Sequence, residues 1–305
     1  MRGTTTPGIE GRPGPVTRGG VGRGVSRSLV RLMLVALTLT SLISACSASS
    51  TPDPNLIKGT FDIGGRSLYI ECSGPASPAV IFDSGLGDTH ATWKAVVSDL
   101  SKIARTCTYD RANLGSSEPA PKPRSSADVV ADLHAVLKAA GVAPPYILVG
   151  HSFGGISVRL FASTYPAEVA GIVLVDPTPT GFVEGECSIV DPSLCETLRQ
   201  GWDPSKNPDG LDIVKSGEEI ARAGPLPAVP FIVLAATIHK QAAITDAALE
   251  TRIEAFWQAE EAKLAATVAG GHLVVVSSGH SIHTLHPEAV IAAIRTVVAP
   301  ATTAQ

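Results

Sequence analysis

At 305 residues, with 44% hydrophobic and 17% charged side chains, the chain is long and apolar enough for one large globular domain, and its composition excludes an intrinsically disordered protein. The net charge of −4 is uneven, because residues 1–31 carry six arginines and one glutamate, which is +5 and leaves −9 for the remainder. The remainder of the chain lacks the basic and aromatic residues from which a nucleic-acid surface is built, so the chain is not expected to bind nucleic acid.

The first 45 residues are typical of an export signal. Basic residues end at Arg31 and are followed by an uncharged run of 14 residues, 32–45, which is shorter than the roughly 20 that a membrane-spanning helix needs. The run ends in Ile43-Ser44-Ala45-Cys46, which resembles the lipobox of bacterial lipoprotein signal peptides. That resemblance implies cleavage before Cys46, a lipid anchor on Cys46 that holds the exported protein at the membrane, and a flexible tether over 46–57. Ordinary cleavage with secretion, or an uncut signal anchor, is the alternative.

Four cysteines remain after Cys46, and an even number in an exported protein favours two disulfides over free thiols. Proximity along the chain favours Cys72–Cys107 and Cys187–Cys195 among the three possible pairings. No CxxC and no histidine or cysteine cluster with ligand spacing occurs, so neither a metal nor a cofactor is expected.

From residue 58 to about 300, short β-rich runs alternate with segments of helical periodicity. The strands are predicted at Gly59–Ile63, Ser67–Cys72, Ala79–Asp83, Thr106–Tyr109, Tyr146–Gly150, Gly171–Asp176, Phe231–Ala236 and Leu273–Ser277, and the clearest helices at Ser126–Ala140, Asp246–Val268 and Pro287–Val298. The alternation predicts a doubly wound, mostly parallel sheet of eight strands whose first two form an antiparallel hairpin. The runs AVIF, YILV, GIVLV, FIVLA and LVVV are predicted to be buried on both faces. Residues 177–230, rich in Pro, Gly and Asp, are interpreted as an insertion over the carboxyl edge of the sheet.

The chemistry is predicted at Gly150-His151-Ser152-Phe153-Gly154, a GxSxG motif. The motif directly follows the strand YILV and precedes a helical pattern, which is the strand–turn–helix context in which such a serine becomes an exposed nucleophile. Glycines two residues away on either side are required because side chains there would collide in the sharp turn.

A nucleophilic serine needs a base, and the candidate is His280, in the loop after the last predicted strand. His283 and His286 are the competitors, and each is more readily explained as packing or capping. His151 is expected to support the turn from the side, whereas His239 and His272 are interpreted as surface loop residues.

The acid that orients the base should lie between Ser152 and His280 in the chain. Asp176 closes the strand GIVLVD at the carboxyl edge of the sheet and is favoured. Asp246 follows the strand FIVLA by about ten residues and is the alternative, although helix capping explains it equally well. Backbone N–H groups of Leu86, in a glycine-rich turn, and of Phe153 are predicted to form the oxyanion hole.

These blocks resemble the α/β-hydrolase superfamily over residues 58–299. The matches are Gly85-Leu86-Gly87, the segment Tyr109-Asp110-Arg111-Ala112-Asn113-Leu114-Gly115-Ser116-Ser117, the GHSFGG turn and the SSGHSIH ending. The resemblance implies the α/β-hydrolase fold, a cap at residues 177–230 after the sixth strand, and neighbouring second and fourth strands that make the Cys72–Cys107 bridge reasonable. Two departures are Asn113, where glycine is usual, and the missing acid after the seventh strand.

The resemblance further implies a serine esterase acting on small or medium acyl esters through Ser152, His280 and Asp176. A serine at the turn argues against dehalogenase and epoxide hydrolase chemistry, which use aspartate there. Perhydrolase or C–C hydrolase activity, and a non-catalytic binding module, are the alternatives.

Overall fold

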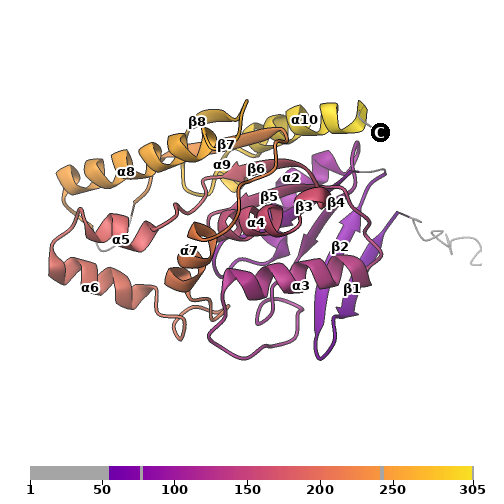
Figure 1. Ribbon diagram of the computed structural model, residues 1–305, viewed down its shortest axis with the longest axis horizontal. Helices are drawn as coiled ribbons and strands as arrows, with labels where there is room; N and C mark the ends of the chain where they lie inside the picture. Colours follow the sequence, from indigo (N-terminus) through magenta and orange to yellow (C-terminus); the bar gives the residue numbers. More distant parts are fainter. Residues whose placement is uncertain (1–54, 76–77, 241–243, 304–305) are drawn as a thin grey trace, which may run out of the picture. The chain divides into compact units, whose positions relative to one another are not determined.

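The computed structural model describes residues 55–75, 78–240 and 244–303, and within them an eight-stranded sheet (Figure 1). Its strands are β1 (Ile57–Asp62), β2 (Ser67–Ser73), β3 (Ala79–Asp83), β4 (Thr106–Tyr109), β5 (Tyr146–His151), β6 (Val169–Val175), β7 (Phe231–Ile238) and β8 (His272–Gly279). The order across the sheet is β1-β2-β4-β3-β5-β6-β7-β8. Strand β2 pairs antiparallel with β1 and β4, and all other pairs are parallel. The predicted eight-stranded, mostly parallel sheet is therefore confirmed.

Helices cover both faces of this sheet (Figure 1). They are η1 (His90–Trp93), α2 (Lys94–Leu100), α3 (Ser126–Ala139), α4 (Phe153–Thr164), η2 (Pro166–Glu168), α5 (Phe182–Cys187), α6 (Pro192–Gly201), α7 (Ile213–Ala221), α8 (Ala247–Ala265), α9 (Ile282–Leu285) and α10 (Pro287–Thr303). One apolar core joins α3, α4 and α8 to one face of the sheet, and a second joins α2 and α10 to the other. The apolar residues of α3 face the sheet because they recur at helical spacing, and Ser125 with Asp128 forms a capping box at its start.

The prediction for the LVVV run was wrong. Leu273, Val274 and Val275 lie on β8 with exposed fractions of 38%, 42% and 58%. Strand β8 ends the sheet, with β7 as its neighbour, so its side chains lack the cover that the central strands receive from helices on both faces.

Both favoured disulfides are present. Cys72 on β2 is bonded to Cys107 on β4, and the two residues are direct partners in the antiparallel register. Cys187, at the end of α5, is bonded to Cys195 in α6. The first bridge thus links neighbouring strands, and the second links the first two helices of the segment between β6 and β7.

That segment packs through a third apolar cluster. Phe182 and Val183 of α5 and Ile213 of α7 contact Trp257 of α8 and Phe153, the first residue of α4. Helix α7 therefore packs against α4, the helix that follows Ser152, while α5 packs against α6 and α8.

The predicted signal, Cys46 and residues 46–54 of the predicted tether lie outside the described residues, and β1 begins at Ile57. Among the residues that the structure describes, no helix combines the length and hydropathy needed to cross a bilayer.

Candidate active site

Ser152 occupies the turn between β5 and α4. Its backbone has φ 52° and ψ −119°, a region that non-glycine residues rarely adopt. Its N–H donates to the carbonyl of Val175 on the neighbouring strand at 3.2 Å, which anchors the turn to the sheet. Such a conformation costs about 1–3 kcal/mol and persists only where the surrounding structure holds it.

Glycines make this turn possible. A Cβ at Gly150 would lie 2.5 Å from the carbonyl oxygen of Gly154, and a Cβ at Gly154 would lie 2.3 Å from that of Asp83. A Cβ at Gly155 would likewise lie 2.6 Å from the Cβ of Pro177. These backbone approaches explain in physical terms why the motif requires glycine on both sides of the serine.

Asp176 follows β6 and faces His280. Its Oδ2 accepts a hydrogen bond from His280 Nδ1 at 2.5 Å, and its Oδ1 accepts one from the backbone N–H of Ala236 at 2.6 Å. Burial alone would raise the pKa of this fully buried carboxyl, but hydrogen bonds from His239 and His280 hold the pKa below its ordinary range. Asp176 is therefore a carboxylate at neutral pH.

The competing acid, Asp246, has another role. It is the N-cap of α8, where its Oδ1 accepts a hydrogen bond from Leu249 N–H at 2.8 Å. Of the two candidates, Asp176 is the one that the structure brings into contact with His280.

His280 directly follows β8 and lines, together with Ser152, a cavity of about 190 Å³. Its side chain is 38% exposed. Ser152 Oγ lies 3.5 Å from Thr178 Oγ1, and no hydrogen bond joins Ser152 to His280 within the described part of the chain. Catalytic hydrogen bonds are often long before substrate binds and shorten in the complex.

His239 was wrongly predicted to lie at the surface. Its side chain is only 4% exposed and stacks on Trp257, with ring centroids 4.4 Å apart. Nε2 contacts Asp176 Oδ2 at 2.8 Å, and Nδ1 contacts Glu254 Oε2 at 3.0 Å. Asp176 is thus held between two imidazoles, of His280 and His239.

The position of His239 explains why it was missed. It directly follows β7, where the family resemblance implies a carboxylate and not a histidine. Burial alone would lower the pKa of His239, but the hydrogen bonds and charges of Asp176 and Glu254 raise it. The sequence around His239 does not point to these contacts, because Asp176 and Glu254 lie 63 and 15 residues away in the chain.

We expect His239→Gln to destabilise the protein by roughly 1.5–3 kcal/mol near pH 6, because charged hydrogen bonds to Asp176 and Glu254 are lost. A histidine whose folded pKa is raised stabilises fully below its ordinary pKa of about 6.5, and this contribution disappears as the pH rises through the folded pKa. Urea unfolding of both proteins at pH 6 and pH 9 should therefore show a difference that shrinks at pH 9. An equal loss at both pH values would mean that only packing on Trp257 was lost.

A further carboxyl lies close to this group. Glu261 of α8 is 1% exposed, and burial, followed by the charge of Asp176, raises its pKa to about 10. Glu261 is therefore protonated at neutral pH and adds no second negative charge beside Asp176.

The predicted oxyanion donors border the same cavity. Leu86 and Phe153 line it with Ser152, and Phe153 begins α4, where backbone N–H groups have no partner within the helix. The loop carrying Leu86 is fixed on both sides: Arg111 donates to the carbonyls of Ser84 and Gly85, and Gly87 N–H donates to Asp209 Oδ1 at 2.9 Å.

Asn113 stands where glycine is usual in the family, and the local backbone accommodates it. Asn113 has φ 76°, the left-handed conformation for which glycine is the usual residue. Its side chain accepts a hydrogen bond from Ala120 N–H at 2.9 Å and donates one to the carbonyl of Asp209 at 2.9 Å. Asparagine therefore adopts the backbone conformation and adds two contacts.

The cavity walls are largely apolar. They are formed by Leu86, Phe153, Phe182, Trp202, Ile213 and Trp257, together with Thr178, Lys240 and the histidines already described. Phe182, Trp202 and Ile213 come from the segment between β6 and β7, so this segment shapes the space in front of Ser152.

The other histidine candidates for the base lie elsewhere. His283 Nε2 contacts Thr92 Oγ1 at 2.9 Å, and His286 Nδ1 contacts Glu288 at 3.1 Å. His151 Nε2 lies 3.1 Å from the carbonyl oxygen of His280. Burial, followed by the nearby charge of His280, lowers the pKa of His151 well below its ordinary range and that of His283 to about 4.

Residues 78–211 match the family described as alpha/beta hydrolase fold. The uncharacterized Bacillus subtilis protein YqjL is 34% identical over 119 residues, which are 39% of this chain and 47% of YqjL. An esterase from Thermogutta terrifontis with bound malate has a TM-score of 0.55 at 20% identity, covering 81% of this chain and 98% of the esterase. The enol-lactonase from Burkholderia xenovorans has a TM-score of 0.58 at 18% identity, covering 79% of this chain and 99% of the lactonase.

The extent of these matches decides what they establish. The match with YqjL spans about half the length of that protein. The two solved structures are distant in sequence and align over nearly their whole length, so they report on the fold.

Proposed function

Because the chain has the α/β-hydrolase fold, we propose that it is a serine hydrolase, acting as a carboxylesterase on small or medium acyl esters. The observation that carries the proposal is the 2.5 Å hydrogen bond between His280 Nδ1 and Asp176, in the cavity that also contains the strained Ser152 turn. A nucleophile, a base and a group that orients the base are the three parts of a catalytic triad.

The proposed reaction has two halves. Ser152 Oγ attacks the ester carbonyl carbon while its proton passes to His280 Nε2, and Asp176 stabilises the resulting imidazolium through Nδ1–H. The N–H groups of Leu86 and Phe153 bind the developing oxyanion. Collapse of the intermediate breaks the ester C–O bond, and the alcohol leaves with the proton of His280. Water then repeats the sequence on the acyl-enzyme, which releases the acid and frees Ser152.

A fluorophosphonate probe tests the nucleophile, since it reacts with activated serines. We expect one label per chain in the wild type and none in Ser152→Ala. Turnover of p-nitrophenyl esters of increasing chain length should fall to background in the same variant, because the acyl-enzyme cannot form. Undiminished ester turnover by Ser152→Ala would refute the proposal. The preferred chain length in the wild type would measure the depth of the apolar cavity.

The N-terminal sequence supports a proposed location. We infer that residues 1–45 direct export and that Cys46 carries a lipid that holds the enzyme at the membrane, on the basis of the basic n-region, the short apolar run and the lipobox-like ending. Cys46→Ala should move the protein from the detergent phase to the aqueous phase on Triton X-114 partitioning. Retention of the variant in the detergent phase would contradict a lipid on Cys46.

A further inference from the structure

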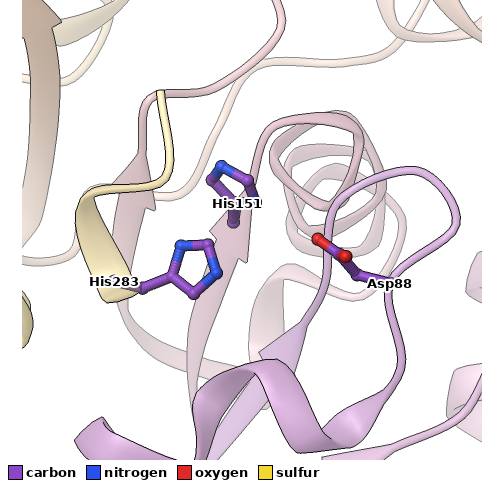
Figure 2. Close-up of side chains that lie close together, drawn as sticks. All are labelled: Asp88, His151 and His283. Atoms are coloured by element: carbon purple, nitrogen blue, oxygen red, sulfur yellow. The ribbon is translucent and has the colours of Figure 1, made fainter. Parts of the chain in front are cut away.

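Three side chains from separate segments of the chain lie close together (Figure 2). Asp88 lies in the loop after β3, His151 ends β5, and His283 lies in α9. One ring nitrogen of each histidine and one carboxylate oxygen of Asp88 all lie within 4.8 Å of one another. Figure 2 shows the Asp88 carboxylate pointing toward the two rings. The reaction proposed above uses none of these groups.

Both histidines have a nitrogen without a partner. His151 and His283 are 3% and 1% exposed, and the Nδ1 atoms of both are buried without a hydrogen-bond partner among the described residues. The Nε2 of His151 faces the carbonyl of His280, which can only accept, so Nε2 carries the hydrogen and Nδ1 carries a lone pair. Buried polar atoms are rarely left unsatisfied, so both nitrogens are available to a ligand.

The space between them is kept open by a glycine. A Cβ at Gly85 would lie 2.8 Å from His151 Nδ1 and 3.0 Å from Asp88 Oδ2, so any side chain there would enter the gap between these two atoms. Asp88 is only half-buried, which leaves a route from solvent.

We propose that Asp88, His151 and His283 bind a divalent transition-metal ion, of which Zn²⁺ is the representative. Two imidazoles and one carboxylate are the donor set that zinc accepts, whereas Mg²⁺ and Ca²⁺ prefer oxygen alone. Tetrahedral zinc places its ligands about 3.3 Å apart, given metal–ligand distances near 2.0–2.1 Å. Rotation of the half-buried Asp88 side chain would draw its oxygen toward the rings and bring the three groups toward that separation.

The hydrogen bonds around the rings match those of known metal sites. A ligating histidine usually donates its second N–H to a carbonyl or another polar group, which fixes the orientation of the ring. His151 donates to the carbonyl of His280, and His283 Nε2 contacts Thr92 Oγ1. A bound ion would link Asp88 in the loop of Leu86, His151 before Ser152, and His283 in α9, which follows His280. It would thereby hold together the three segments that carry the proposed active site.

Zinc binding to the untagged full-length chain, stripped with EDTA, tests the site. Titration calorimetry should give one tight site per chain, and a zinc concentration about 100-fold above Kd should raise Tm by roughly 5–10 °C. Asp88→Asn and His283→Gln should each weaken zinc binding by about 10-fold or more. Asp88→Asn keeps the size of a half-buried side chain, so it serves even if His283→Gln fails to fold. Thermal melts in EDTA establish that each variant is folded.

A second group provides the matched control, because Asp176, His239 and His280 also offer three donor atoms within 4.8 Å of one another. His239→Gln should bind zinc as tightly as the wild type if the ion lies between Asp88 and the two histidines. Loss of binding in His239→Gln with retention in Asp88→Asn would place the ion at the other group and overturn the proposal. Absence of any zinc-dependent heat or Tm shift in the wild type would overturn it as well.

Discussion

Replacing Asp176 with asparagine is expected to lower kcat by about 10⁴-fold, the effect measured when the aspartate of a serine protease triad is replaced in this way. The carboxylate accepts the Nδ1–H of His280 at 2.5 Å, which leaves Nε2 of the neutral ring free to take a proton from Ser152. An amide can donate to Nδ1 instead, and the ring would then carry its hydrogen on Nε2 and could not act as a base. Steady-state kinetics on a p-nitrophenyl ester measures the loss.

Asp246→Asn is the matched control. Asp246 caps α8 through a hydrogen bond from Leu249 N–H, and asparagine caps helices about as well as aspartate. We therefore expect kcat, KM and stability to be nearly unchanged. If Asp246→Asn were inactive while Asp176→Asn kept its activity, the acid would have been assigned to the wrong residue.

The second large effect is expected at Arg111, which is 4% exposed. Its guanidinium contacts Asp83 at 2.6 Å and Asp209 at 2.7 Å, and both carboxylates are buried. Arg111→Met would leave two buried carboxylates without their cation. Removing one member of a buried ion pair costs about 3–5 kcal/mol, so the free energy of unfolding in urea should fall by that amount.

Arg222→Met supplies the comparison for this measurement. Arg222 pairs with Glu218 at the surface of α7 at 3.2 Å, and both side chains are more than half exposed. An exposed pair of this kind contributes less than about 1 kcal/mol. Similar losses in the two arginine variants would show that the Arg111 network does not hold the fold together as we describe.

Much of the fold could be predicted because its signals are local. The strand YILV, the glycines at 150 and 154 and the helical pattern that follows are contiguous, so the Ser152 turn could be placed from one short segment. The bridge between Cys72 and Cys107 required one further fact, that β2 and β4 are neighbours, and the family resemblance supplied it.

What could not be predicted depends on distant partners. The role of His239 follows from Asp176, 63 residues earlier, and from Glu254 on the next helix, and neither contact leaves a pattern near His239 itself. The LVVV run has the same composition as the buried strands, and composition does not indicate which strand will end the sheet. The cluster of Asp88, His151 and His283 was missed for a similar reason, since its members lie 63 and 132 residues apart in the chain.

The contacts of Asp209 have a practical consequence for engineering. Asp209 belongs to the segment between β6 and β7, yet its carboxylate binds Gly87 N–H in the loop of Leu86 and the guanidinium of Arg111 in the sheet domain. A chimera that exchanges residues 177–230 for those of another protein with the α/β-hydrolase fold would therefore remove a support of the loop of Leu86 together with walls of the cavity. Grafts that retain Asp209, and exchange only the helices α5 and α6, should change walls of the cavity and leave the loop of Leu86 supported.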